Sequence, residues 1–245
     1  MKMKYQKTKE EIINYNQKIV NDNSKNISQS SKIKKYWNFF PTPKQLIVKM
    51  LEDYKDKPLP KNILEPSAGK GDIIDYLNEA TKGTSNLYCY EIVPELQNIL
   101  KTKPNCQLLG DDFLNHQENI KFDLIIMNPP FDRGVEHVLN AWEILKDGGE
   151  IIALLNKHSY FNAYNSHRLK FRTLVDNFGS IEDLGTCFDS NVERTARVDV
   201  VLVKITRKSN KYYQDLGINL AIYPISSIRS TRAEYIVREL DLIKK

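Results

Sequence analysis

The chain has 245 residues, of which 41% are apolar and 27% are charged, as is typical of one globular domain with modest additions. No apolar run approaches the length of a membrane span, and the first residues lack the hydrophobic core of a secretory signal. The three cysteines lie far apart and the four histidines show no metal-binding spacing, which argues against a disulfide framework and a metal site. These features predict a cytoplasmic protein without a bound metal.

The net charge of +5 is unevenly distributed along the chain. Residues 1–36 carry +6 and residues 204–245 carry +5, whereas residues 37–203 carry −6. Basic ends of this kind suit binding to nucleic-acid phosphates, although lysine-rich ends also serve simply to keep a terminus solvated. We expect a basic, polar N-terminal extension over residues 1–35 that is partly disordered or helical, a folded domain over residues 36–207, and a basic C-terminal extension over residues 208–245.

The expected helices and strands alternate along the folded domain. Residues 10–20 favour a short helix before it, and an aromatic cluster at residues 36–40 marks its start. Thr42 is expected to cap a helix over residues 43–54 that has Pro43 at its first position. Short apolar strands are expected at residues 62–65, 86–91, 107–109, 122–127 and 150–156, with helices over 73–80, 94–101 and 134–145 and a turn at 146–149. This alternation predicts an α/β fold with a parallel, doubly wound sheet.

The end of the domain breaks this rhythm. Residues 181–188 and 198–205 are both strand-like, and only a polar loop separates them. A loop that short cannot form a parallel crossover, which predicts an antiparallel pair. Residues 208–245 are polar and basic, with a helix expected over residues 232–243.

The first predicted strand leads into a loop with two glycines, Glu65-Pro66-Ser67-Ala68-Gly69-Lys70-Gly71-Asp72. Glycines let the backbone approach a ligand closely, and a following helix N-terminus points N–H groups at it. The loop is not a P-loop, because Gly71 follows Lys70 in place of Ser or Thr, and it is not a dinucleotide fingerprint, because the third glycine would fall at Ile74. Acidic residues also follow the next two strands, at the edge where open α/β sheets bind ligands.

The strand at residues 122–127 runs directly into Asn128-Pro129-Pro130-Phe131. In an arbitrary loop, Asn-Pro-Pro is a turn signal. At the ligand-binding edge, the Asn128 side-chain oxygen and the Pro129 carbonyl can accept the two hydrogens of an exocyclic amine and favour a pyramidal, more nucleophilic nitrogen. The prolines fix φ and remove competing N–H donors, and Phe131 offers an aromatic face for a base to stack on. These four residues are the predicted catalytic residues.

The loop and the tetrapeptide resemble those of class I S-adenosylmethionine-dependent methyltransferases. Asn-Pro-Pro-Phe is more similar to adenine-N6 enzymes than to cytosine-N4 or protein-glutamine enzymes. The order of the two motifs and the segment at residues 39–43 resemble the γ class of DNA adenine-N6 methyltransferases, in particular small forms from phages and mobile elements. The resemblance implies a Rossmann-like sheet closed by an antiparallel hairpin strand, with the catalytic domain at residues 36–207.

The same resemblance implies roles for individual residues. Glu65 would hold the methionine ammonium of the cofactor, Glu91 the ribose hydroxyls, and Asp112 with Phe113 the adenine. The full set of implied cofactor-binding residues is Phe40, Pro41, Thr42, Glu65, Pro66, Ser67, Ala68, Gly69, Gly71, Asp72, Glu91, Ile92, Asp112, Phe113 and Asn128.

The expected partner is nucleic acid, with DNA favoured over RNA. Phe131 and Phe188 are the candidates for contact with the target base, and Arg194 and Arg197 for contact with nucleic acid; Phe188 suits a structural role at a strand end nearly as well. γ-class enzymes usually carry a long recognition domain after this point, so a separate specificity subunit or a homodimer is a further expected partner. An RNA adenine-N6 methyltransferase and a non-catalytic nucleic-acid-binding module remain alternatives.

Overall fold

The computed structural model describes residues 41–116, 119–162, 165–187 and 198–209. The predicted helices at residues 10–20 and 232–243 and the aromatic cluster at residues 36–40 lie outside these ranges. In chain order the elements are α2 (Lys44–Met50), η2 (Glu52–Tyr54), β1 (Asn62–Glu65), α3 (Asp72–Thr81), β2 (Asn86–Tyr90), α4 (Pro94–Leu100), β3 (Cys106–Gly110), η3 (Phe113–Asn115), β4 (Phe122–Met127), α5 (Gly134–Glu143), β5 (Leu145–Asn156), α6 (His158–Phe161), α7 (Ser166–Phe178), β6 (Gly179–Gly185) and β7 (Val200–Thr206).

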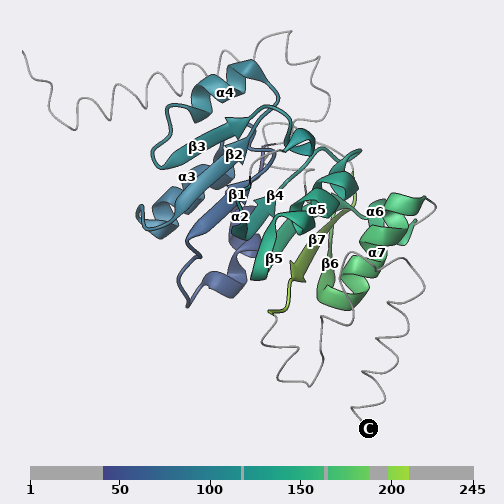
Figure 1. Cartoon of the computed structure of the whole chain (residues 1–245). Coiled ribbons are helices and arrows are strands. Elements are labelled where there is room, and N and C mark those ends of the chain that lie inside the picture. The colour runs from purple at the N-terminus through teal and green to yellow at the C-terminus, as the bar shows by residue number, and fades with distance from the viewer. Residues whose placement is uncertain (1–40, 117–118, 163–164, 188–197, 210–245) are drawn as a thin grey trace, which may run out of the picture.

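The strands form one seven-stranded sheet in the order β3-β2-β1-β4-β5-β7-β6, with helices on both faces (Figure 1). The strands from β1 to β5 pair in parallel, whereas β7 is antiparallel to both of its neighbours, β5 and β6. The predicted doubly wound sheet with a terminal antiparallel hairpin is therefore confirmed. β1 and β4 also have the predicted bounds.

The central strands are buried on both faces, because successive side chains of a strand point to opposite sides of the sheet. In β4, Leu124 and Ile126 belong to one apolar cluster, which includes residues of α2 and α3. Ile125 and Met127 belong to the other cluster, which includes residues of α5 and α7. Helices packed on both faces hold the end of β4, where Asn128 follows, in a fixed position.

Two local predictions are wrong. Thr42 does not cap the first helix, because α2 begins at Lys44 after Pro43 and has no side-chain cap. The predicted turn at residues 146–149 lies inside β5, where Leu145 pairs with Phe122 and the ladder resumes with Glu150 opposite Leu124. These residues bulge out of the ladder with β4. They bond instead to the backbone of Arg207, the residue after β7: the Gly148 N–H donates to the Arg207 carbonyl, and the Gly149 carbonyl accepts from the Arg207 N–H.

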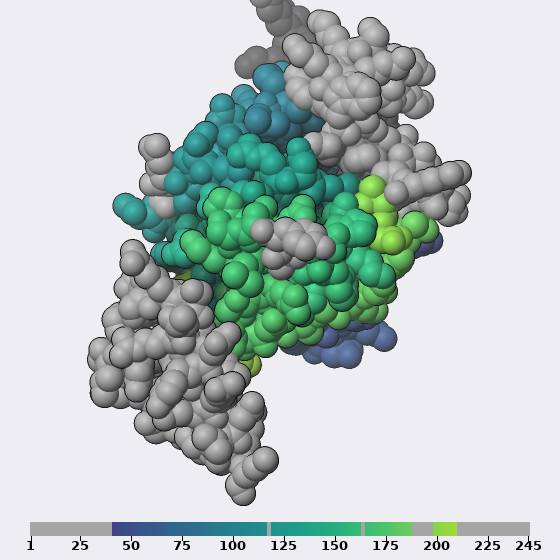
Figure 2. All heavy atoms as spheres, turned by 90° about the vertical axis from the view of Figure 1, so that its right-hand side faces the viewer, coloured from purple at the N-terminus to yellow at the C-terminus, as the bar shows by residue number. Residues whose placement is uncertain are grey.

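The helices α6 and α7 fill the connection from β5 to β6 and lie on the side of the molecule seen in Figure 2. Phe171, Leu174 and Val175 bury the apolar side of α7, while Arg172 and Asp176 form an exposed ion pair on its other side. This pattern fits an amphipathic helix that covers the sheet. Within the described ranges, no helix is long and apolar enough to cross a membrane.

Candidate active site

The carboxyl ends of β1, β2, β3 and β4 lie along one edge of the sheet, because these strands are parallel neighbours. Glu65 is the last residue of β1, and Glu91, Asp112 and Asn128 follow β2, β3 and β4 within two residues. The fold therefore brings the four predicted polar residues to the edge where open α/β sheets bind ligands.

The Glu91 carboxylate connects the glycine loop to the end of β2. Its Oε2 accepts from the Gly69 N–H at 2.6 Å, and its Oε1 accepts from the Val93 N–H at 2.9 Å. Burial raises the pKa of this carboxyl, and the backbone hydrogen bonds partly oppose that effect. Each carboxylate oxygen keeps a second lone pair, so Glu91 can hold the loop and still accept from a ligand hydroxyl.

An exposed apolar side chain stands directly beside this carboxylate. Ile92 is 60% exposed, although it lies between the buried residues Glu91 and Val93. A flat apolar or aromatic ligand group placed over Ile92 would remove that surface from water. The pair of Glu91 and Ile92 therefore suits a ligand with hydroxyls next to an aromatic ring.

Glu65 presents an incompletely satisfied carboxyl group at the end of β1. The residue is 2% exposed, and its Oε2 has no hydrogen-bond partner among the described residues. Burial is the main reason that the pKa of Glu65 is raised well above its usual range, and the charge of nearby Asp72 raises it further. A bound cation would satisfy this oxygen and stabilise the ionised carboxylate, so Glu65 is suited to hold an ammonium group.

Gly71 is favoured by its backbone conformation, and its neighbours leave little room for a side chain. Its φ of +89° lies in the left-handed region, and a Cβ atom at this position would lie 2.4 Å from Lys103 Cε. The Lys103 side chain is 7% exposed and its ammonium pairs with Asp75 of α3 at 2.6 Å. No local sequence pattern indicates Lys103, because this residue follows α4 and reaches the loop only through the tertiary fold.

Asp112 and Phe113 begin the short helix η3 after β3. Asp112 Oδ1 accepts from the Leu114 N–H at 2.9 Å, so this carboxylate caps the helix. Phe113 is 1% exposed and packs against Tyr90 with 5.6 Å between the ring centroids. Asp112 thus lies at the predicted edge, whereas the Phe113 ring belongs to the core beneath it.

The tetrapeptide leaves the end of β4 and leads into α5. Asn128 is half-buried, and its Nδ2 donates to Thr42 Oγ1 at 3.1 Å. Pro129 is buried, and a Cβ atom at Gly134, the first residue of α5, would lie 3.5 Å from Pro129 Cγ and 2.6 Å from Leu155 Cδ2. Phe131 is half-buried against the apolar cluster of α2 and α3. The absence of a side chain at Gly134 therefore lets the start of α5 pack closely on the segment that follows Asn128.

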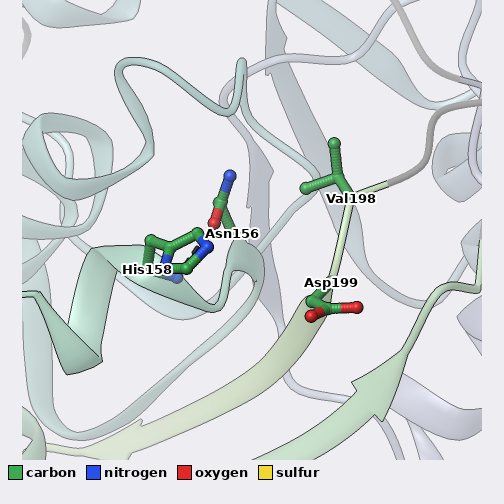
Figure 3. A pocket seen from close by; sticks show the side chains of 4 residues that line it. All are labelled: Asn156, His158, Val198 and Asp199. Carbon is green, nitrogen blue, oxygen red and sulfur yellow. Dashed lines mark hydrogen bonds between the residues drawn. The ribbon is translucent and has the colours of Figure 1, made fainter.

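A hollow of about 190 Å³ lies between the end of β5 and the start of β7 (Figure 3). It is lined by Asn156, His158, Val198 and Asp199. The Asn156 side-chain oxygen accepts from the backbone N–H of His158 at 2.9 Å. Asn156 is not among the predicted site residues, although its place at the end of β5, the strand beside β4, is a signal for a site residue.

Four predicted site residues lie outside the described ranges: Phe40, Phe188, Arg194 and Arg197. Of the remaining predicted cofactor residues, Pro41, Thr42, Pro66 and Ala68 are buried, whereas Ser67 and Asp72 are half-buried. The Ser67 hydroxyl has no hydrogen-bond partner within the described part of the chain. It is therefore a second polar group at the edge, besides Glu65, that a ligand could satisfy.

The sheet order and its antiparallel last strand define a class I methyltransferase fold. The model of the methyltransferase small domain family matches residues 47–184, which is more than half of the chain. The chain belongs to this family. It is also 34% identical over 92 residues to the type II methyltransferase M.CvrRI of Paramecium bursaria Chlorella virus XZ-6E. That alignment covers 38% of this chain and 24% of the viral enzyme, so the chain matches about a quarter of its relative's length.

Solved structures share the fold at low sequence identity. A modification subunit of a putative type I restriction enzyme from Vibrio vulnificus YJ016 superposes with a TM-score of 0.60 at 12% identity, over 84% of this chain and 51% of that one. The methyltransferase subunit of a type I restriction-modification system from Streptococcus thermophilus superposes with a TM-score of 0.56 at 14% identity. This match covers 70% of this chain and 45% of that one. The N-methyltransferase NodS of Bradyrhizobium japonicum WM9, in complex with S-adenosyl-L-homocysteine, superposes with a TM-score of 0.51 at 12% identity. This match covers 75% of this chain and 95% of that one.

Proposed function

We propose that this protein transfers a methyl group from S-adenosylmethionine to the exocyclic N6 of adenine in DNA. The observation that carries the proposal is the position of Asn128-Pro129-Pro130-Phe131. The segment leaves the carboxyl end of β4, beside β1, whose end carries the buried Glu65. A turn-forming Asn-Pro-Pro would not need a place at the ligand-binding edge of the sheet.

The residues at this edge fit S-adenosylmethionine. Glu65 has a buried carboxylate oxygen without a partner among the described residues, which suits the cofactor's ammonium group. Glu91 has lone pairs left for the ribose hydroxyls, and the exposed Ile92 beside it suits the adenine ring. When bound, the cofactor supplies an electrophilic methyl group on a sulfonium. NodS, a protein with the same fold, is known in complex with S-adenosyl-L-homocysteine, which supports this choice.

The tetrapeptide would act on the amine of the target. The Asn128 side-chain oxygen and the Pro129 carbonyl oxygen would accept its two hydrogens, which favours a pyramidal nitrogen with an available lone pair. Phe131 is only partly buried, so the residue keeps exposed surface against which a base could stack. The contribution of these residues is positioning: they hold the amine so that its lone pair is aligned for attack on the methyl group.

Two observations favour DNA over RNA as the target. The chain is similar to a viral type II methyltransferase over 92 residues. The segment at residues 39–43, which precedes the cofactor loop, resembles DNA-modifying enzymes. Phe188, Arg194 and Arg197 remain the predicted contacts on the target side, and a specificity subunit or a second copy of the chain is proposed to complete target recognition. Reaching an adenine within a duplex would require flipping the base out of the stack.

The experiment that tests this proposal measures transfer of a tritiated methyl group to duplex DNA, single-stranded DNA and RNA under the same conditions. We expect label in DNA and little in RNA. Label mainly in RNA would shift the proposal to an RNA methyltransferase, and binding of nucleic acid without any transfer would indicate a non-catalytic module.

A further inference from the structure

A hydrogen bond connects two segments that are far apart in the sequence. Asn128 Nδ2, after β4, donates to Thr42 Oγ1, before α2, at 3.1 Å. Thr42 is 8% exposed, so water competes little for its hydroxyl. The bond therefore lies in an environment where a lost partner is not easily replaced.

Both ends of this bond lie on restrained backbone. Thr42 stands between Pro41 and Pro43, and Asn128 is followed by Pro129 and Pro130. Proline fixes its own φ and restricts the residue before it. Thr42 is further fixed because Ile47 and Met50 of α2 pack into the same apolar cluster as residues of β4. Little conformational entropy remains to be lost when the bond forms.

The orientation of the Asn128 amide decides which atom can meet the target. An amide presents an acceptor on one branch and a donor on the other, and a rotation of 180° exchanges them. In the proposed reaction only the acceptor, Oδ1, is useful, because Nδ2 would place its hydrogens against those of the amine. A threonine hydroxyl can accept or donate, so the contact restrains the amide, and in this structure Nδ2 lies on Thr42 and Oδ1 on the other branch.

We propose that Thr42 is a positioning residue, which fixes the Asn128 amide so that its oxygen is presented to the target amine. This inference rests on the proposed function of Asn128. It gives Thr42 a role other than the cofactor contact that the sequence resemblance implies. It also accounts for a threonine that does not cap the helix it precedes.

Three variants separate these roles. Thr42→Val keeps the shape and removes the hydroxyl, whereas Thr42→Ser keeps the hydroxyl. Thr81→Val is the matched control, because Thr81 is also buried and its hydroxyl has no hydrogen-bond partner within the described residues. We expect Thr42→Val to lower kcat by about tenfold or more, since a buried donor loses its acceptor. The Kd for S-adenosylmethionine should stay unchanged, Thr42→Ser should restore most of kcat, and Thr81→Val should resemble the wild type.

A second measurement does not depend on activity. The side-chain NH2 signals of Asn128, assigned by their loss in Asn128→Asp, should shift in Thr42→Val and return toward their wild-type positions in Thr42→Ser. Unchanged signals in Thr42→Val, or an unchanged kcat, would overturn the positioning role. A rise in cofactor Kd that accounts for the lost activity would instead make Thr42 a cofactor ligand. If the wild type methylates no nucleic acid, the proposed function fails, and the NMR signals still decide whether the bond exists.

Discussion

Glu91→Gln should destabilise the protein before any ligand is added. The wild-type carboxylate accepts from two backbone donors, Gly69 N–H and Val93 N–H. A glutamine has only one acceptor oxygen, so one of these donors would face the NH2 group. Leaving one buried donor without an acceptor costs about 1–3 kcal/mol. Burial disfavours the charged form of Glu91 and raises its pKa, so replacing the carboxylate with a neutral amide offsets part of this cost. The amide still has no second acceptor for the unpaired donor.

This change is large enough to measure by thermal unfolding. For a domain of this size, the lost free energy corresponds to a decrease of about 2–12 °C in Tm. The matched control is Glu143→Gln, because Glu143 is exposed at the end of α5 and should change Tm little. Calorimetry should also show weaker binding of S-adenosylmethionine to Glu91→Gln. If Glu91→Gln unfolds at the same temperature as the wild type, the carboxylate does not hold the loop as described.

Four further variants test other parts of the site. Asn128→Ala should reduce methyl transfer by about 100-fold or more while cofactor affinity in calorimetry stays nearly unchanged; normal turnover would refute the proposed mechanism. Burial raises the pKa of Glu65 above its usual 4.5, so the folded protein favours the protonated carboxyl group. The stability that this group provides is therefore fully present below pH 4.5 and is lost as the pH rises towards the pKa of the folded state. Glu65→Gln should therefore become more stable than the wild type as the pH rises above about 4.5 in urea unfolding, and a pH-independent difference would contradict this. Gly71→Ala should cost more stability than Gly148→Ala, since both glycines have positive φ but only Gly71 has a neighbour in the way of a Cβ; equal losses would show that Lys103 simply moves aside. Deleting residues 1–36, which carry a net charge of +6, should weaken nucleic-acid binding and flatten its salt dependence, and equal slopes would show that this segment does not contact phosphates.

The sequence predicts the sheet well because its signals are local. β1 and β4 are short apolar runs bounded by polar residues, and both were predicted with their observed bounds. The short loop after β6 predicted the antiparallel strand, since a parallel crossover needs a longer connection. Because parallel neighbours end at the same edge, the grouping of Glu65, Glu91 and Asn128 also follows from the strand order.

The contacts that hold the site together could not be predicted in the same way. The bond between Thr42 and Asn128 joins residues 86 positions apart, and no local pattern indicates it. Lys103 reaches Gly71 only because α4 packs beside the loop, and the bulge in β5 depends on bonds to Arg207, which follows β7. In each case the tertiary fold determines which residues come into contact. Local signals suggested a helix cap at Thr42 and a turn at residues 146–149 instead.

The central claim, methylation of adenine N6 in DNA, is tested most directly by identifying the product. Duplex DNA would be incubated with the protein and labelled S-adenosylmethionine, digested to nucleosides and analysed by mass spectrometry, with Asn128→Ala in parallel. The proposed function predicts labelled N6-methyl-2′-deoxyadenosine from the wild type and little from Asn128→Ala. Label on cytosine, no labelled nucleoside, or equal product from both proteins, would contradict it.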